Sequence, residues 1–237
     1  MCTATYLKDK SGKIIFTTNR DEHVARPTQA PSIHMIKGQK LLFPRDELAG
    51  GTWIAVNEKG WIACMMNGAE GEHQWLGTSA EKSRGQVLLD SFEFNAAEAF
   101  LTNGIFEKAH PFTLLLVRPD ETNIHAIKWN GSKKWSETYD ANQPHIWSAY
   151  TLYPEEQRKE RFERFNKWSK DQSNLQKEST FKLHHSSKSK GGLLLENSGK
   201  VDTISITQLT LDQSKCTMRY FEIETQKDKV VELDLVH

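Results

Sequence analysis

The first 22 residues, MCTATYLKDKSGKIIFTTNRDE, determine how the rest of the sequence can be interpreted. Two runs rich in β-branched and aromatic residues, Thr3 to Leu7 and Lys13 to Thr18, flank the polar stretch KDKSG, whose glycine is typical of a turn. This pattern predicts a β-hairpin. Because a hairpin returns the end of its second strand to the start of its first, we expect the polar cluster NRDE (residues 19–22) to lie beside Cys2.

Cys2 has the chemistry of a self-contained catalytic unit. Removal of the initiator methionine would free its α-amine, with a pKa of about 7.7 to 8.0, next to a thiol with a pKa of about 8.5. The amine can then take the thiol proton and later return it to a leaving group. Because Cys2 begins a β-rich run, the strand would hold the amine in place. The alternative is that a cysteine at position 2 is an accident of a frayed terminus.

The NRDE cluster offers partners for that residue. Asp21 could orient and stabilise the α-ammonium group, and Arg20 could lower the thiol pKa or hold an anionic substrate group. Asn19 and Glu22 flank this pair and are predicted to contact the substrate. Because neighbouring residues of an extended strand point to opposite faces, Arg20 reaches the thiol only if the backbone has already turned. A solvated turn whose charges pair with one another is the alternative interpretation.

The remaining pattern predicts an α+β protein built on antiparallel sheets, since strands and helices follow one another without regular βα alternation. The two prolines of ARPTQAPS (residues 25–32) favour a surface loop. Pro154 to Lys170 predicts a helix with Phe162, Phe165 and Trp168 as its buried stripe. We expect a single domain over residues 1–237. The further predicted strands are Thr52 to Val56, Trp61 to Met66, Phe112 to Arg118, Asn123 to Trp129, Lys134 to Thr138, Ile204 to Leu211, Thr217 to Glu224 and Val230 to Leu235, and the further predicted helices lie within Ser83 to Phe92 and Ala96 to Leu101.

Composition and charge exclude several classes of protein. The 237 residues are 37% hydrophobic and 26% charged with a net charge of zero, so there is no global electrostatic reason to bind nucleic acid or an anionic membrane. The longest strongly apolar stretch, Phe112 to Val117, is too short to span a bilayer. The N-terminus lacks the basic region of a secretory signal, and we therefore expect a cytoplasmic protein.

The cysteines and histidines do not form a recognisable metal site. Cys2, Cys64 and Cys216 are odd in number and include no CxxC pair, which argues against a disulfide framework and a thiolate zinc site. We expect Cys64 and Cys216 to have packing roles. The sequence contains no HExxH motif, no GxGxxG before a helix and no P-loop lysine, so neither a metal nor another cofactor is expected.

Several of these motifs together resemble the NRDE (TANGO2-like) family. They are MC at the N-terminus, TTNRDE after one hairpin, ARPT, PRDELAGGTW and SRG. The resemblance covers most of the first 120 residues and extends more loosely to the C-terminus. The family is similar to N-terminal nucleophile (Ntn) hydrolases, which implies an αββα sandwich of two antiparallel sheets flanked by helices.

Within Ntn hydrolases, the choloylglycine hydrolase and penicillin V acylase branch cleaves linear amide bonds with an N-terminal cysteine. The resemblance implies that Cys2 is the nucleophile and that Asp21 positions its amine. The stretch VNEKGWIACMMN resembles a hairpin of that branch whose following asparagine, here Asn67, supplies an oxyanion donor. Asn67 could instead cap a loop at the hairpin end. Trp53 is expected either to line an apolar substrate pocket or to belong to the core.

The sequence also departs from these relatives. Thr18 stands where the amidase branch has an arginine, and Ala149 stands where NRDE relatives commonly have an asparagine. Thr203 and Ser205 occupy the strand in which the family has a late arginine. Two functions therefore stay open: a cysteine amidohydrolase acting on a small linear amide, and a non-catalytic carrier of a hydrophobic ligand such as haem or a lipid, a role proposed for family members. The sequence does not indicate an oligomeric state.

Overall fold

The computed structural model describes residues 3–75, 80–171, 176–196 and 199–236. The chain forms two antiparallel sheets with helices, which confirms the predicted α+β class. It divides into two compact units. The described residues of the first unit lie within Met1–Arg26, Asn142–Ser148 and Leu152–Val236, and those of the second lie within Pro27–Ala141 and Ala149–Thr151.

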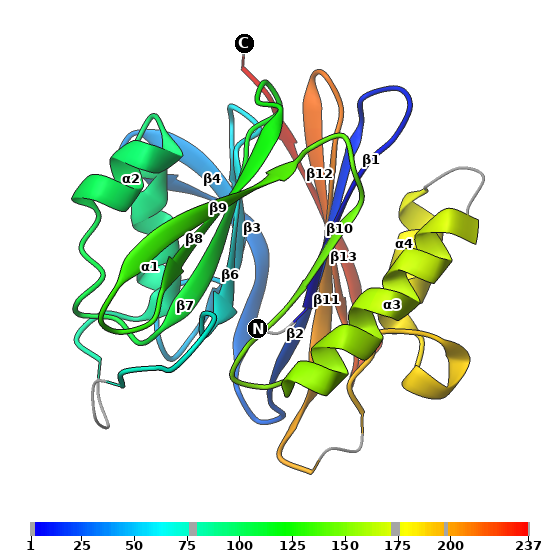
Figure 1. Ribbon diagram of the computed structural model, residues 1–237. Helices are drawn as coiled ribbons and strands as arrows, with labels where there is room; N and C mark the ends of the chain where they lie inside the picture. Colours follow the sequence, from blue (N-terminus) through cyan, green and yellow to red (C-terminus); the bar gives the residue numbers. More distant parts are fainter. Residues whose placement is uncertain (1–2, 76–79, 172–175, 197–198, 237) are drawn as a thin grey trace. The chain divides into compact units, whose positions relative to one another are not determined.

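The first unit contains a six-stranded sheet in the order β10-β1-β2-β11-β12-β13. Helices α3 and α4 lie on the same face of this sheet (Figure 1). Since β1 pairs with β10 on one side and β2 on the other, the N-terminal strand lies in the interior of this sheet. The elements are β1 (Thr3–Lys8), β2 (Ile14–His23), β10 (His145–Ser148), α3 (Glu155–Asp171), α4 (Lys177–His185), η2 (Lys188–Lys190), β11 (Val201–Leu211), β12 (Lys215–Glu222) and β13 (Asp228–Asp234).

The N-terminal hairpin forms as predicted, and its side chains divide the helix-covered face into an apolar part and a polar part. The carboxylate of Asp9 organises the turn by accepting from the backbone nitrogens of Ser11 at 2.8 Å and Lys13 at 3.0 Å. Near the turn, Leu7 and Ile15 are paired in the ladder and pack in one apolar cluster with Phe165, Leu183 and Leu193. Towards the other end of the same face the side chains become threonine, asparagine and aspartate.

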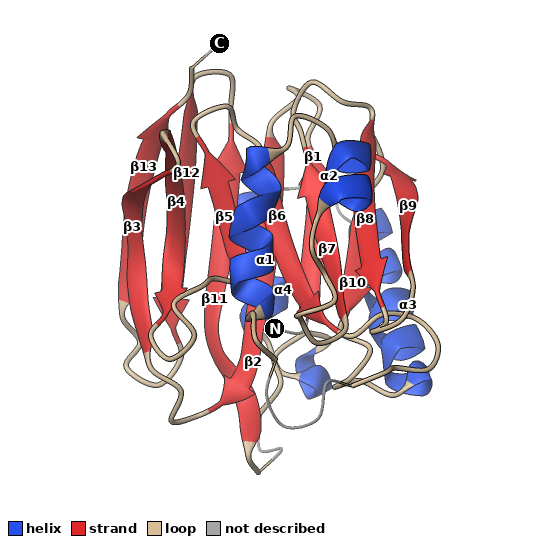
Figure 2. Ribbon diagram, turned by 90° about the vertical axis from the view of Figure 1, so that its left-hand side faces the viewer, coloured by secondary structure: helices blue, strands red, loops and turns tan. Residues whose placement is uncertain are grey.

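The second unit contains a seven-stranded sheet whose strands follow one another in chain order from β3 to β9. Helices α1 and α2 cover one face of this sheet (Figure 2), and the apolar core between them includes Leu88, Phe100, Phe106 and Leu114. The elements are β3 (Thr28–Ile36), β4 (Gln39–Asp46), β5 (Ile54–Asn57), β6 (Ile62–Asn67), α1 (Arg84–Asp90), η1 (Ser91–Glu93), α2 (Ala97–Asn103), β7 (Phe112–Val117), β8 (Asn123–Trp129) and β9 (Lys134–Asp140).

Some sequence-based expectations are wrong. Residues 28–32 of the segment expected as a loop belong to β3, and Pro31 is accommodated because β3 is an edge strand with a register shift between Gln29 and Ser32. Strands β4 and β10 and helix α4 were not predicted. In α3, Phe165 is buried and Trp168 is partly buried, but Phe162 is 54% exposed, so the buried stripe does not include it.

The glycines of the GGTW and SRG motifs allow two backbone segments of the second unit to approach closely. A Cβ atom at Gly51 would lie 2.5 Å from the carbonyl carbon of Gly85, and one at Gly85 would lie 2.7 Å from the backbone nitrogen of Thr52. Next to Gly85, Ser83 caps α1 by accepting from the backbone nitrogen of Gln86 at 3.1 Å. The two motifs therefore fix where α1 begins against the loop that precedes β5.

We expect Gly51→Ala to lower the free energy of unfolding by about 2 to 3 kcal/mol, because the new methyl group would overlap with the backbone of Gly85. The measurement is urea unfolding. Gly50→Ala is the matched control: Gly50 has φ +67° with open space around it, so only the conformational cost of about 1 kcal/mol applies. Equal losses in the two variants would show that the close approach is not the constraint.

Candidate functional site

Asp21 is a buried carboxylate held by two hydroxyl groups of the first unit. Its side chain is near the end of β2, and the residue is only 3% exposed. Oδ2 accepts a hydrogen bond from the Tyr153 hydroxyl at 2.6 Å, and Oδ1 accepts from the Thr203 hydroxyl at 2.5 Å. Thr203 is itself fixed, because its hydroxyl oxygen accepts from the backbone nitrogen of Leu195 at 2.9 Å. The carboxylate therefore has a defined orientation.

Asn19 holds a helix to the sheet and is fully buried. Its Nδ2 donates to the carbonyl oxygens of His184 and Leu193, at 3.2 Å each. Its Oδ1 lies 2.6 Å from Nδ1 of His184, and because an amide oxygen can only accept, Nδ1 carries the proton. The other ring nitrogen, Nε2, then accepts from the hydroxyl of Thr5 at 2.8 Å. These contacts give Asn19 a structural role, whereas its predicted role in substrate contact stays a prediction.

Arg161, on α3, was not predicted and is a central residue of this site. It is 7% exposed, and its Nη2 donates to the Thr3 hydroxyl at 2.7 Å and to the Leu193 carbonyl oxygen at 2.6 Å. Its guanidinium also lies over the Tyr153 ring, 4.3 Å from the centroid. Helical spacing could have indicated it, since Arg161, Phe165 and Trp168 are separated by four and three residues and share one face.

The other predicted site residues of the N-terminal segment are Cys2, Arg20 and Glu22. Cys2 lies outside the described residues, so its predicted approach to Asp21 and Asn67 stays a prediction. Arg20 is 2% exposed and neighbours Asp21 on the strand; in the ladder it stands opposite Ser205, whose buried hydroxyl has no hydrogen-bond partner among the described residues. Glu22 is partly exposed and accepts from the backbone nitrogen of His23 at 3.0 Å.

Asn67 and Trp53 belong to the second unit. Asn67 ends β6, is partly exposed, and its backbone oxygen accepts from the nitrogen of Tyr150 at 3.1 Å. Trp53 is 5% exposed, which agrees with a core position more than with an open pocket wall. Cys64 and Cys216 are completely buried, as their predicted packing roles require, and burial raises the pKa of the Cys216 thiol.

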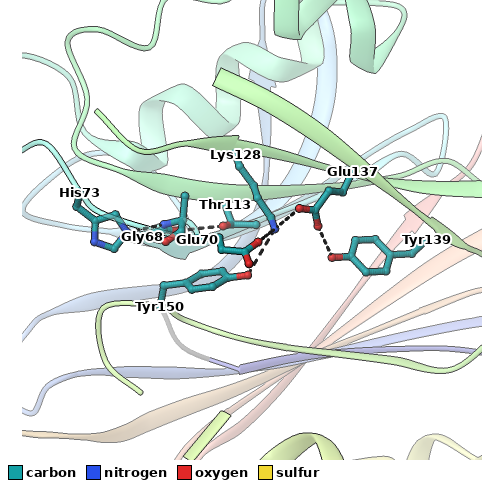
Figure 3. A network of polar contacts seen from close by, with 9 residues as sticks. Gly68, Glu70, His73, Thr113, Lys128, Glu137, Tyr139 and Tyr150 are labelled. Carbon is teal, nitrogen blue, oxygen red and sulfur yellow. Dashed lines mark hydrogen bonds and ion pairs between the residues drawn. The ribbon is translucent and has the colours of Figure 1, made fainter. Parts of the chain in front are cut away.

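The second unit holds a polar network of its own around Lys128 (Figure 3). The side chain of Lys128 is 3% exposed, and its Nζ lies 2.6 Å from Oε1 of Glu137 and 3.4 Å from both Glu70 and the Tyr150 hydroxyl. Tyr139 donates to the second oxygen of Glu137 at 2.8 Å. Burial alone would raise the pKa of Glu137, but hydrogen bonds from Lys128 and Tyr139 outweigh it and leave the pKa below its usual value. The network therefore pairs a buried ammonium group with carboxylates that are partly exposed.

The described residues contain no group of three or more His, Cys, Asp or Glu side chains arranged to hold a metal ion. Among the helices in the described ranges, none is long and apolar enough to cross a membrane.

Solved structures show the class of fold to which the chain belongs. Two variants of conjugated bile acid hydrolase from Clostridium perfringens match with TM-scores of 0.63 and 0.61, each at 11% identity, covering 97% and 98% of this chain and 92% of the hydrolase. The N-acylethanolamine-hydrolyzing acid amidase ortholog of Caenorhabditis elegans matches with a TM-score of 0.55 at 12% identity, covering 88% of this chain and 92% of the amidase. The chain therefore has the fold of the Ntn hydrolases.

The family follows from the sequence itself. Residues 1–225 match the family Transport and Golgi organisation 2, TANGO2, and the chain belongs to this family. The resemblance identified from the N-terminal motifs is thereby confirmed. No curated protein matches the chain.

The pH dependence of stability should show that the buried His184 stays neutral in the folded protein. Burial, assisted by the positive charge of Arg161, lowers the pKa of His184 from 6.5 to about 3. Between these two values the unfolded chain binds a proton that the folded protein does not, so the free energy of unfolding should fall by about 1.4 kcal/mol for each pH unit from 6.5 towards 3. Urea unfolding across this range measures the slope.

His184→Gln keeps the residue neutral at every pH and should remove this part of the slope, at a cost of about 1 to 2 kcal/mol at pH 7 for the altered hydrogen bonds. The neighbouring His185 is exposed, and His185→Gln is expected to leave the slope unchanged. A slope that survives His184→Gln would contradict the assignment of a neutral buried imidazole.

For the Lys128 network, we expect Glu137→Gln to lower the free energy of unfolding by about 2 kcal/mol at pH 7, because it removes the nearest countercharge of a buried ammonium group. The double variant Lys128→Met, Glu137→Gln should recover part of that loss, since the uncompensated charge is gone. Chemical unfolding of the two single variants and the double variant gives the coupling. Strictly additive losses would show that the two side chains do not depend on one another.

Proposed function

We propose that this protein is an N-terminal-cysteine amidohydrolase that cleaves a linear amide bond of a small substrate, with Cys2 as the nucleophile. The observation that supports it best is the buried Asp21, held by Tyr153 and Thr203. Thr3 pairs with Asn19, two residues before Asp21, so the carboxylate lies at the end of β2 that adjoins the start of β1. Such a carboxylate is suited to stabilise a positive charge on the α-amine of the residue that precedes Thr3.

In the proposed reaction, the α-amine of processed Cys2 takes the thiol proton, and the thiolate sulfur attacks the amide carbon. The ammonium then returns the proton to the leaving nitrogen as the C–N bond breaks, which leaves a thioester and a free amine. A water molecule gives one proton to the α-amine and attacks the thioester, and the released sulfur takes that proton back. The products are a carboxylic acid, an amine and unchanged Cys2.

The remaining roles belong to the same proposal. Asn67 would donate to the oxyanion of each tetrahedral intermediate, a contribution of roughly 3 to 4 kcal/mol in comparable sites. Asp21 would orient the amine, and Arg20 is proposed near the site without an assigned step. The solved structures of similar fold act, by their names, on conjugated bile acids and N-acylethanolamines, both acyl amides, which supports small acyl amides as the substrate class. A cytoplasmic location stays a prediction.

The first test is the reactivity of Cys2 in protein whose Met1 is removed, as established by intact mass. At pH 7.0, iodoacetamide should label Cys2 several-fold faster than free cysteine, because a lowered thiol pKa raises the thiolate fraction by more than it lowers the nucleophilicity of the thiolate. Cys64 and Cys216 are fully buried and should stay unlabelled in the folded protein, so peptide mapping reads out a single site.

Turnover is then measured on N-acyl amino acids, N-acylethanolamines and glycine-conjugated bile acids. Cys2→Ala should abolish hydrolysis without changing the unfolding midpoint, whereas Cys64→Ala should lower the midpoint and leave the activity of the folded fraction unchanged. The enzyme would be excluded if processed Cys2 reacts no faster than free cysteine and none of these amides is hydrolysed. The carrier interpretation would then take its place. Met1 fully retained on protein from the native host would also exclude the enzyme, since a peptide nitrogen cannot act as the base.

A further inference from the structure

The first unit contains a cavity of about 360 Å³ between α3 and the segment 188–196. This volume is comparable to about a dozen water molecules and lies at the lower end of the range of ligand pockets. Tyr153 and Arg161 line it on the side of the Asp21 network, and Arg164 and Lys188 add two further cationic groups. The cavity has room for a small polar molecule or for one end of a larger one.

Arg161 carries a buried positive charge without a carboxylate partner. No acidic side chain of the described residues lies within 4.0 Å of its guanidinium, although the residue is 7% exposed. Both recorded hydrogen bonds use Nη2 and go to neutral oxygens, those of Thr3 and Leu193. Among the described residues, neither its Nε nor its Nη1 has a hydrogen-bond partner. Since a buried charge without a countercharge is costly, this side chain has unused capacity to bind an anion.

The charged groups that line the cavity carry an excess of one positive charge, because Arg161, Arg164 and Lys188 stand against Glu160 and Glu196. Glu160 is engaged by Lys188, whose Nζ lies 2.6 Å from Oε2, and it lies 4.0 Å from Nη2 of Arg164. Arg164 itself donates from Nη1 to the Gly192 carbonyl oxygen at 2.7 Å. Burial, together with the positive charge of Arg161, lowers the pKa of Arg164. An anion between α3 and the segment 188–196 would stabilise the positive charges of both guanidinium groups.

We propose that this cavity binds the oxyanion group, a carboxylate or a phosphate, of a small ligand, with Arg161 and Arg164 as the charged donors. The cavity adjoins the Asp21 network through Tyr153, which lines it and donates to Asp21, and through Arg161, which contacts the residue after Cys2. A ligand held there would lie next to the start of β1. The proposal depends on binding alone and stands whether or not the protein hydrolyses an amide.

The test uses the full chain and two probes, inorganic phosphate and acetate, titrated by calorimetry at pH 7 against a constant ionic strength maintained with sodium chloride. We expect saturable binding of at least one probe, with a rise in Tm of about 5 to 10 °C at 100 times its Kd. Tighter binding of phosphate would indicate a phosphorylated ligand, and tighter binding of acetate would indicate a carboxylate ligand. Either result supports the site.

Three variants on α3, each of which lowers the net charge by one, distinguish binding in the cavity from a general effect of net charge. Arg164→Gln removes a cationic donor and Gln157→Glu adds a carboxylate to the lining, and both should weaken binding at least about tenfold. Lys167 is exposed and does not line the cavity, so Lys167→Gln should bind as the unmodified chain does. Binding of neither probe, or equal weakening by all three variants, would overturn the proposal.

Discussion

The antiparallel pairing of β1 with β2 is the constraint on which the site of the first unit depends. Strict alternation places Thr3, Thr5, Asn19 and Asp21 on the face covered by α3 and α4, where every one of these side chains is removed from water. Buried polar groups require partners, and the two helices and β11 supply them as His184, Arg161 and Thr203. A shift of the hairpin by one residue would turn all of these groups away from their partners.

Asp21 has hydrogen-bond partners on this face although the late arginine of the family is absent from the sequence. Thr203 occupies the strand in which the family has an arginine, and its short hydroxyl reaches the carboxylate directly from β11. A guanidinium is still present, but it comes from α3 and contacts Thr3 rather than Asp21. The buried carboxylate and the buried guanidinium thus come from different elements of the first unit, Asp21 from β2 and Arg161 from α3.

Sequence patterns predicted the elements whose hydrophobic periodicity is strong. They failed for elements and residues whose position depends on contacts with distant parts of the chain. Alternating β-branched residues located the N-terminal hairpin and β11 to β13, and the return of that hairpin towards Cys2 led to Asp21 in the NRDE cluster. Helix α4 was not predicted because its sequence, KESTFKLHH, has a weak apolar stripe. The helix is held instead by the contact of His184 with Asn19, 165 residues away in the sequence. Arg161 was hidden because a charged residue in a charged helix is usually solvated, and only the facing Thr3 and Leu193 make it a buried group.

The order of segments along the chain has a consequence for how the protein is made. The first unit begins at the N-terminus but is completed only by β11, which pairs with β2, and the Asp21–Thr203 hydrogen bond joins residues 182 positions apart. At a synthesis rate of about 5 to 20 residues per second, the N-terminal hairpin waits roughly 10 to 35 s on the ribosome for that partner. Throughout this interval the sheet that contains the start of β1 lacks β11. Removal of Met1, which the proposed function requires, can therefore take place before β11 completes the sheet.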